Sequence, residues 1–283
     1  MSHPPAVIIG APRSGTNMLR DALCAVDGVA TWPCDEINYI WRHGNLRYPT
    51  DELPEHLATS SVRSYIRSQF EWVSKRYSAT TVVEKTCANS LRVPFVDRVI
   101  PNARYVFVIR DGIDVVGSAN LRWRGDAGLV YILKKARFVP KPDIPYYAAS
   151  FLQSRLHRIR SSERRAGSWG PVFDGMTELL QGTSLNEICL RQWQRCVNLA
   201  ADALADLPAD RVMLVRYEQF VQAPEQGLEM VLRFLNIEAA DQEIGRSVAG
   251  VSSSSIGKGR RQLDPQEVDS LEPRVAATLS RFE

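Results

Sequence analysis

A glycine-rich segment near the start of the chain combines residue types that bind anions. Residues 10–17 read Gly-Ala-Pro-Arg-Ser-Gly-Thr-Asn, so a cation, Arg13, and two hydroxyls, Ser14 and Thr16, accompany two glycines. The backbone N–H groups of such a turn, and those that begin the following helix, attract phosphate-like groups. The pattern predicts an anion-binding loop, although a turn of this kind also occurs as a plain connection between a strand and a helix.

Gly10 and Gly15 have the spacing of a Walker loop, but the residues that follow differ from one. A nucleotide-hydrolysing loop continues with Lys, which reaches the outer phosphates, and with Ser or Thr, which binds magnesium. Thr16 and Asn17 occupy those positions, and Arg13 supplies a cation from inside the loop. We therefore expect an anion to bind here without the groups that usually hold magnesium and ATP.

Two further cations follow segments that are predicted as strands. Lys85 comes after residues 80–83, and Arg110 comes directly after residues 104–109, which form the strongest β pattern in the chain. In parallel α/β sheets, ligands bind beyond the carboxyl ends of the strands. We therefore expect Arg13, Lys85 and Arg110 to face one crevice.

The elements that must position these residues alternate along the chain. Short apolar runs rich in β-branched residues predict strands at 6–9, 80–83, 104–109 and 211–217. Apolar residues at helical spacing predict a helix from the first loop to Val26 and further helices at 62–77, 89–100, 113–123, 184–207 and 224–235. This alternation predicts an α/β fold of three layers, doubly wound and mainly parallel.

Two features within the predicted helices mark boundaries. Pro94 either kinks the 89–100 helix or begins a new segment there. Ser184 and Glu187 have the spacing of a capping box at the start of the long 184–207 helix. Cys189 and Cys196 lie seven residues apart in it and are predicted as small core residues.

The chain is predicted to form a single domain over residues 1–283, because no Gly/Pro/Ser linker separates two cores. Core strands and motifs fall in 6–123 and 185–262, and a variable, largely helical cap or acceptor region covers about 124–184. The cap region holds a basic run at 155–165, which is either a solvated helix face or a contact for an acidic partner. Its aromatic residues either line an acceptor pocket or pack the cap: Tyr131, Phe138, Tyr146, Tyr147 and Trp169.

Composition narrows the class of protein. The 283 residues are 45% hydrophobic and 24% charged, as in an ordinary globular protein, and the net charge of +3 is too small to indicate nucleic acid or membrane binding. The five cysteines show no CxxC or zinc-ligand spacing, so we expect reduced thiols, no metal site and a cytoplasmic location. No signal peptide and no apolar run of about 20 residues are evident.

Four segments in the same order resemble motifs of the sulfotransferases that use 3′-phosphoadenosine 5′-phosphosulfate (PAPS). Residues 12–16 resemble the 5′-phosphosulfate loop, and residues 110–118 resemble the 3′-phosphate motif, an Arg followed eight residues later by a Ser. Residues 215–220 resemble a later strand-end element, and residues 255–261 the basic loop that closes over the nucleotide. The Arg in the first loop is similar to the tyrosylprotein and many bacterial members.

The resemblance implies a P-loop-NTPase-like fold, PAPS as co-substrate, 3′-phosphoadenosine 5′-phosphate (PAP) as product, and a role for each matching position. Glu36 matches the general base, and Lys85 a catalytic lysine. The positions that the resemblance assigns to nucleotide binding are Arg13, Ser14, Gly15, Thr16, Asn17, Arg110, Ser118, Arg122, Tyr217, Ser255, Ile256, Gly257, Lys258 and Arg260. Gly259 departs from the family, which often has Trp there, and any serine from Ser252 to Ser255 is a candidate for the nucleotide contact.

The chemistry of sulfuryl transfer agrees with these residue types. Negative charge grows on the bridging oxygen as the phosphate leaves, and Arg13 and Lys85 are suited to stabilise it, each such contact being worth about 2–4 kcal/mol. A carboxylate such as Glu36 can deprotonate the acceptor and so gain roughly 10²–10⁴-fold in rate. The leaving group carries no triphosphate, so we expect no metal requirement.

Plainer interpretations remain for several of these residues. Glu36 can instead cap a helix that begins near Asn38, and His43 is the alternative base. Lys85 can be an ordinary strand-end lysine, Arg110 a salt-bridge partner of Asp111 or Asp114, and Tyr217 a packing aromatic. The basic residues after Gly257 can be a solvated loop.

Two other functions compete with sulfuryl transfer: a kinase-like phosphotransferase, and a non-catalytic PAP or nucleotide-binding protein of the same fold. The sequence does not distinguish among small-molecule, carbohydrate and peptide acceptors. It also leaves open whether the protein forms a homodimer.

Overall fold

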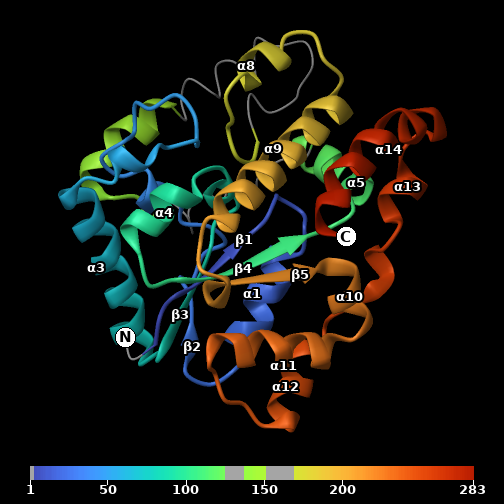
Figure 1. Ribbon diagram of the computed structural model, residues 1–283. Coiled ribbons are helices and arrows are strands. Elements are labelled where there is room, and N and C mark those ends of the chain that lie inside the picture. Colours follow the sequence, from blue (N-terminus) through green and yellow to red (C-terminus); the bar gives the residue numbers. More distant parts are fainter. Residues whose placement is uncertain (1–2, 125–136, 151–168) are drawn as a thin grey trace.

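A parallel β-sheet forms the centre of the protein. The computed structural model describes residues 3–124, 137–150 and 169–283. In these residues the sheet has five strands in the order β2-β3-β1-β4-β5, and each neighbouring pair is parallel (Figure 1). The strands are β1 (Ala6–Ile9), β2 (Val29–Ala30), β3 (Thr81–Lys85), β4 (Arg104–Ile109) and β5 (Val212–Arg216).

Successive side chains of the central strands enter two separate cores. In β1, Val7 and Ile9 belong to one core cluster and Ala6 and Ile8 to the other. The same alternation occurs in β4, because side chains of a strand point to opposite faces in turn. Both faces are therefore covered, and this explains why these strands read as continuous apolar runs rather than alternating ones.

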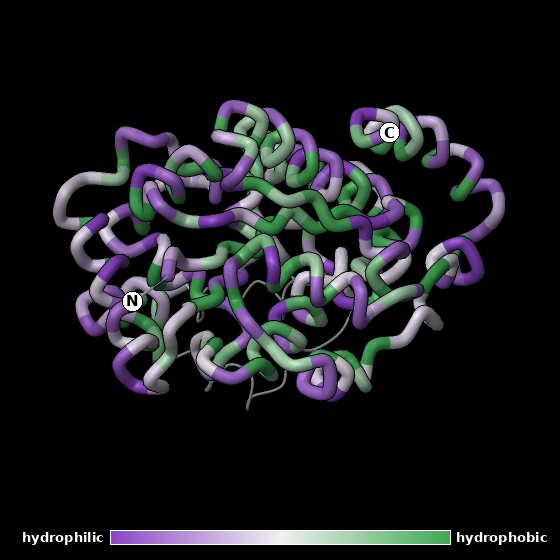
Figure 2. The backbone as a smooth tube through the Cα atoms, turned by 60° about the horizontal axis from the view of Figure 1, so that its bottom comes forward, coloured by the Kyte–Doolittle hydropathy of each residue, from purple (hydrophilic) through white to green (hydrophobic). Residues whose placement is uncertain are grey.

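Helices cover the two faces and make the three layers that the sequence predicts. One core is completed by α3 (Ser60–Tyr77), α4 (Val93–Val99), α5 (Gly112–Arg124), α9 (Leu185–Ala205) and α14 (Pro265–Leu279). The other is completed by α1 (Thr16–Cys24), α10 (Tyr217–Gln222), α11 (Pro224–Leu235) and α12 (Asp241–Val248). The hydrophobic segments pass through the middle of the molecule, whereas the outermost loops are mostly hydrophilic (Figure 2).

Shorter helices connect these layers: α2 (Asn38–Trp41), α8 (Met176–Leu179), α13 (Lys258–Gln262) and the 3₁₀ segments Cys87–Leu91, Lys141–Asp143 and Ser253–Ser255. Of the expected cap region, only 137–150 and 169–184 are described. Tyr131 and the basic run at 155–165 therefore lie outside the described residues. None of the helices in the described part is long and apolar enough to span a bilayer.

The structure refines several predicted boundaries. Strand β3 continues to Lys85, two residues beyond the prediction, so this lysine ends the strand and is buried. Pro94 does not kink a helix. It lies in the first turn of α4, where its missing N–H costs nothing. Ser184 caps α9 by accepting a hydrogen bond from the Glu187 N–H at 3.3 Å, as predicted, and Cys189 and Cys196 are buried in the core.

The strand order puts the topological switch point of the sheet between β1 and β4, and we call the region beyond the carboxyl ends of these two strands the crevice. The chain leaves β1 through α1 toward β2 on one side, and it leaves β4 through α5 on the other side of the sheet. Connections that diverge in this way open a space beyond the carboxyl ends of the two strands. The loop after β1 and the residues after β4 border this space.

Candidate active site

The loop between β1 and α1 is a tight turn that leaves no room for a side chain at Gly15. Arg13 (φ 72°) and Gly15 (φ 91°) both have left-handed backbone conformations. A Cβ atom at Gly15 would lie 2.3 Å from Cδ2 of Tyr217, so the ring packs directly on the loop. Gly15 is also the N-cap of α1, where no side chain caps the helix. The first-turn N–H groups of α1 are therefore suited to an anion.

Arg110 joins this loop to the C-terminal part of the chain. Its Nη1 donates to the backbone oxygen of Arg13 at 3.0 Å, and its Nη2 donates to that of Ser255 at 2.8 Å. The guanidinium also lies 4.3 Å from the centre of the Tyr217 ring and 3.5 Å from Oδ2 of Asp114. Arg110 does pair with Asp114, but it also bridges the first loop and the Ser255 segment.

Ser118, which is predicted to bind the 3′-phosphate together with Arg110, contacts the first loop. Its Oγ accepts a hydrogen bond from Arg13 Nε at 2.9 Å. Burial, and then the positive charges of Arg122 and Arg110, lower the pKa of Arg13. Arg122 is exposed and lies one turn after Ser118 on α5, so the two share a helix face. Three guanidinium groups thus concentrate positive charge beside the first loop.

Lys85 and Glu36 form an ion pair beside the same loop. Lys85 Nζ donates to Glu36 Oε1 at 2.9 Å, and the Cys87 N–H donates to the same oxygen at 3.4 Å. Burial alone would lower the pKa of Lys85, but the acidic groups of Cys87, Glu36 and Asp35 together raise it. The buried ammonium therefore stays charged.

Glu36 does not cap the helix that follows it. The N-cap of α2 is Ile37, and no side chain caps this helix. Asp35 is the carboxylate that ties the region together: it accepts from Asn17 Nδ2 at 2.7 Å and from Arg20 Nη1 at 3.1 Å, and it lies 3.6 Å from Lys85 Nζ. Asp35 thereby connects α1 to the end of β3, a role that the sequence reasoning missed although the residue adjoins Glu36.

The alternative base, His43, is engaged elsewhere. Its Nδ1 lies 2.8 Å from Oδ2 of Asp143, and its ring centre lies 4.1 Å from that of Tyr65. These contacts make it a satisfied histidine of the α2–α3 region.

The C-terminal basic loop is held against α5 by Asp114, which the sequence reasoning weighed only as a salt-bridge partner of Arg110. Asp114 Oδ2 accepts from the Gly257 N–H at 2.8 Å, and Oδ1 accepts from the Gly259 N–H at 2.7 Å. Tyr217 Oη is hydrogen-bonded to Ser255 Oγ, so Ser255 is the serine of this segment that reaches the crevice. Ser252 instead caps the 3₁₀ turn Ser253–Ser255.

Gly259 is required where the family often has Trp. A Cβ atom at this position would lie 2.3 Å from the backbone oxygen of Ile113, and a Cβ atom at Gly117 would lie 2.8 Å from Cα of Gly259. The two glycines therefore let α13 and α5 approach closely. The departure from the family pattern thus has a structural reason in this chain.

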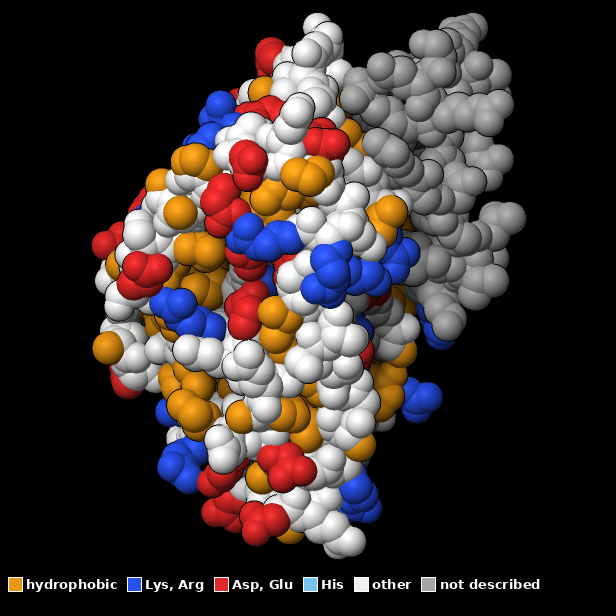
Figure 3. Space-filling model, turned by 90° about the vertical axis from the view of Figure 1, so that its right-hand side faces the viewer, with side chains coloured by type: hydrophobic (Ala, Val, Ile, Leu, Met, Phe, Trp, Pro, Cys, Tyr) orange, Lys and Arg blue, Asp and Glu red, His pale blue; other side chains and the backbone are white. Residues whose placement is uncertain are grey.

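The remaining predicted residues of this loop have varied surroundings. Ile256 and Gly257 are partly buried, and Lys258 is exposed. Arg260 pairs with Asp111 at 3.1 Å and with Glu272. Basic and acidic side chains are interspersed over the face formed by α13 and α14 (Figure 3). Arg260 is therefore already neutralised by carboxylates.

A buried polar network lies behind Glu36. Arg92 is fully buried, donates from Nη2 to Asn38 Oδ1 at 2.6 Å, and lies 3.5 Å from Asp51. Asn38 in turn donates to Asp51 Oδ1 at 3.1 Å. Because Asn38 is two residues after Glu36, the network fixes the segment that carries the carboxylate.

Two residues of the crevice carry buried polar atoms without a partner in the described part of the protein. Among the described residues, nine buried side-chain polar atoms have no hydrogen-bond partner, and two of them, Ser14 Oγ and Arg110 Nε, belong to residues that border the crevice. Leaving such groups unsatisfied costs about 1–3 kcal/mol each, and buried polar groups in native proteins are nearly always paired. One belongs to the first loop and the other to the residue after β4, so the crevice fits a ligand with two anionic groups.

Comparisons with known proteins identify the family of the chain. The sequence model described as "Sulfotransferase family" matches residues 4–165 and 157–241. Protein-tyrosine sulfotransferase 1 of Danio rerio is 33% identical over 89 residues, or 29% of this chain and 25% of the relative; the corresponding Drosophila melanogaster protein is 28% identical over 80 residues, or 26% and 16%. The matched segment thus spans a quarter or less of these relatives' length.

Solved structures extend the likeness over nearly the whole chain. The sulfotransferase domain from the curacin biosynthetic pathway has a TM-score of 0.60 at 15% identity, with 98% of each chain covered. Mouse sulfotransferase SULT7A1, complexed with PAP, has a TM-score of 0.51 at 12% identity, with 99% of this chain and 85% of the mouse chain covered. At such identities the likeness concerns the fold.

Proposed function

The chain belongs to the sulfotransferase family, and from this premise we propose that it transfers a sulfuryl group from PAPS to a hydroxyl or amine of an acceptor. One observation carries the choice of donor. The crevice holds two orphaned donors, Ser14 Oγ and Arg110 Nε, in segments that match the 5′-phosphosulfate and 3′-phosphate motifs. A ligand with a phosphosulfate and a separate phosphate would satisfy both.

The residues around the crevice divide into groups that would hold the two ends of the nucleotide. The first loop, with Ser14, Thr16 and the N–H groups at the start of α1, suits the phosphosulfate. Arg110, Ser118 and Arg122 suit the 3′-phosphate. Tyr217 and Ser255, which are joined by a hydrogen bond, border the space between the first loop and the C-terminal segment.

The residues of the crevice supply charge stabilisation and a base. PAPS, when bound, supplies a sulfuryl group whose bond to the phosphate oxygen breaks as a bond to the acceptor oxygen forms. The Lys85 ammonium and the Arg13 guanidinium stabilise the negative charge that develops on the departing phosphate. The Glu36 carboxylate accepts the proton of the acceptor hydroxyl.

The ion pair of Lys85 with Glu36 orients both groups before the reaction. Each holds the other at 2.9 Å, next to the loop that would bind the phosphosulfate. The Cys87 N–H gives the carboxylate a second donor. Their geometry is thus set in advance of binding, which reduces the reorganisation that the reaction needs.

Calorimetry with PAP and with ATP plus Mg²⁺ tests this proposal against a kinase-like phosphotransferase. We expect PAP to bind tightly and ATP–Mg²⁺ to bind weakly, because Thr16 and Asn17 replace the residues that hold the outer phosphates and the metal. Binding of ATP–Mg²⁺ without preference for PAP would refute it.

A non-catalytic nucleotide-binding role is tested separately. A transfer screen with labelled PAPS against an extract, followed by mass spectrometry of the product, should yield a sulfated acceptor. PAP binding without any labelled product would favour the non-catalytic role.

A further inference from the structure

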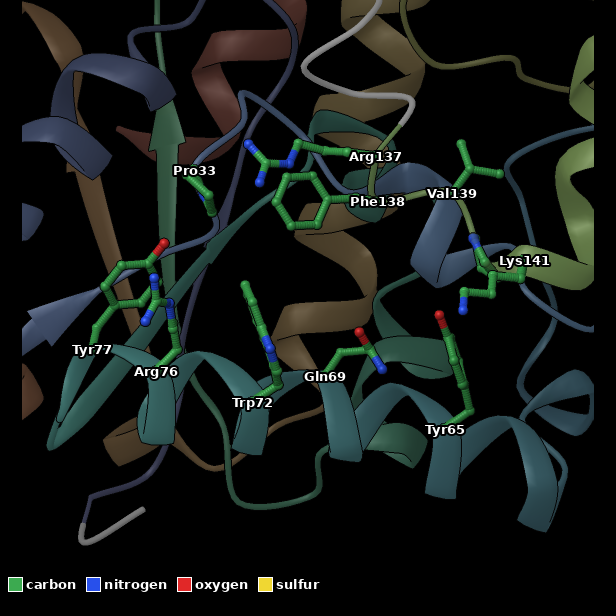
Figure 4. Close-up of a pocket in the computed structure, with 11 residues that line it drawn as sticks. Pro33, Tyr65, Gln69, Trp72, Arg76, Tyr77, Arg137, Phe138, Val139 and Lys141 are labelled. Carbon is green, nitrogen blue, oxygen red and sulfur yellow. The ribbon is translucent and has the colours of Figure 1, made fainter.

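A groove of about 600 Å³ lies outside the crevice, between α3 and the segment 137–141. In the close-up, side chains of α3 rise toward that segment, Phe138 lies above Trp72, and Pro33 lies above the end of the groove formed by Arg76 and Tyr77 (Figure 4). None of these residues takes part in the contacts of the crevice described above. The groove therefore needs its own explanation.

Helix α3 presents two different faces. Val62, Ile66, Phe70 and Val73 enter the core, whereas Tyr65, Gln69, Trp72 and Arg76 line the groove. The second set has the same helical spacing and extends over twelve residues, 65–76, or about 16 Å along the helix axis. This stripe is longer than a single sugar or aromatic ring, so it suits a chain-like ligand.

Aromatic side chains form the floor of the groove. The Trp72 ring is 41% exposed, and its centre lies 6.1 Å from that of Phe138 and 6.4 Å from that of Tyr77. Exposed aromatic surface gathered in one groove marks a binding site more often than an isolated exposed ring does. The faces of such rings stack on the C–H faces of sugar rings.

The charge of the groove is positive only. Arg76, Arg137 and Lys141 line it, and the described residues that line it include no carboxylate. Lys75, the neighbour of Arg76, lies outside the groove and faces Glu71 at 3.8 Å instead. Guanidinium groups bind carboxylates and sulfates through paired hydrogen bonds, so the groove selects an anionic ligand.

Two common ways of binding peptides do not fit this lining, and an acidic peptide would use its cations but not its aromatic rings. The groove lies on a helix and a turn, so it offers no sheet edge to an extended peptide. Among the described residues that line it, Val139 is the only aliphatic side chain other than prolines. An amphipathic helix would therefore bury little apolar surface there. Aromatic rings, the Gln69 amide and three cations match an anionic oligosaccharide. We propose that the groove binds an acidic glycan chain, such as a uronic-acid oligosaccharide.

Two residues of the groove adjoin the segment that carries Glu36. Pro33 lies three residues before Glu36 in the same loop, and Tyr65 at the far end of the stripe contacts His43 of the α2 region. A glycan in the groove would lie beside this segment, and we assign the groove as a subsite for a glycan acceptor. This assignment as an acceptor subsite rests on the proposed sulfuryl transfer, whereas glycan binding in the groove does not.

Calorimetry with three matched probes tests the proposal: tetragalacturonate, which has sugar rings and carboxylates; maltotetraose, which has only the rings; and tetraglutamate, which has only the carboxylates. We expect tetragalacturonate to bind, and the other two to bind about tenfold more weakly or not at all. Trp72→Ala and Arg76→Ala should each lower the affinity for tetragalacturonate about tenfold. Lys75→Ala removes one positive charge from the same helix and should change nothing.

Equal affinity of tetraglutamate and tetragalacturonate would overturn the glycan assignment, and unchanged affinity in both groove variants would overturn the site. Thermal unfolding of each variant identifies loss of folding. PAP titrated into the same samples separates this proposal from the proposed function. PAP binding without glycan binding refutes the groove alone, and glycan binding without PAP binding refutes the donor alone.

Discussion

Arg13 Nε donates a 2.9 Å hydrogen bond to Ser118 Oγ, joining the first loop to helix α5. The sequence motif associates Ser118 with Arg110 instead, but Arg110 donates to the backbone of Arg13 and Ser255. Segments 10–17, 110–118 and 255–259 therefore form one connected polar unit. Binding of a phosphate at one of these segments should influence the others.

Arg110→Ala should lower the affinity for PAP by about 10- to 100-fold, the range expected for the loss of a contact to a charged group. The affinity for adenosine 5′-phosphosulfate should fall much less, because this ligand has no 3′-phosphate. Calorimetry with both ligands measures the difference. Arg233→Ala, on the exposed surface of α11, serves as the matched control. Equal losses for the two ligands would show that Arg110 does not bind the 3′-phosphate.

Glu36→Gln should keep the affinity for PAP and lower turnover of any identified acceptor by roughly 10²–10⁴-fold, because the amide cannot accept the proton. Rate measurements with labelled PAPS check this. His43→Gln removes the alternative base, and since His43 already contacts Asp143 we expect its activity to remain near that of the wild type. The reverse pattern would assign the base to His43.

Gly259→Ala should destabilise the fold by about 1–3 kcal/mol, the usual cost of forcing extra atoms into a packed contact. The new Cβ would lie 2.3 Å from the Ile113 oxygen and 2.5 Å from Asp114 Cα, and backbone atoms cannot turn aside. Gly250→Ala is the control, because a Cβ there meets nothing within 4 Å. Denaturant unfolding compares them, and similar midpoints would contradict the close approach of α13 and α5.

Glu84→Gln should change how stability depends on pH. Burial raises the pKa of Glu84 above its ordinary value of 4.5, so above that pH the folded protein keeps a proton that the unfolded chain has lost. Stability contributed by this group therefore falls as the pH rises. The difference between the melting temperature of the wild type and that of Glu84→Gln should shift against the wild type as the pH rises above 4.5. A constant difference would refute the raised pKa.

Most of the fold was predictable from local patterns. The runs at 6–9 and 104–109 are continuous and β-branched because both of their faces are covered, and they form β1 and β4 with the predicted ends. The end of β3 was harder to predict from the sequence, because Glu84 and Lys85 are polar and yet buried. Their burial depends on partners from distant segments, which no local pattern reveals.

Some features of the candidate site were likewise predictable from the sequence, and others were not. Glycine spacing and the positions of Arg13, Lys85 and Arg110 after predicted strands indicated which segments meet, since parallel strands end at one edge. The contacts of Asp35 with Asn17, Arg20 and Lys85 cross between segments and left no spacing signal. The hydrogen bonds from Gly257 and Gly259 to Asp114 had only a weak signal in the sequence, namely that Asp114 lies four residues after Arg110.

By itself, the sequence determined the order of strands and helices and the residue types in each loop, because backbone propensity and side-chain periodicity act over a few residues. Only the tertiary structure decided which atoms pair: Ser118 with Arg13, Lys85 with Glu36, and Gly117 against Gly259. These contacts depend on sheet order and on the approach of helices, to tenths of an ångström. The physical reason is that hydrogen bonds and close packing are short-ranged, so they appear only once distant segments have been brought together.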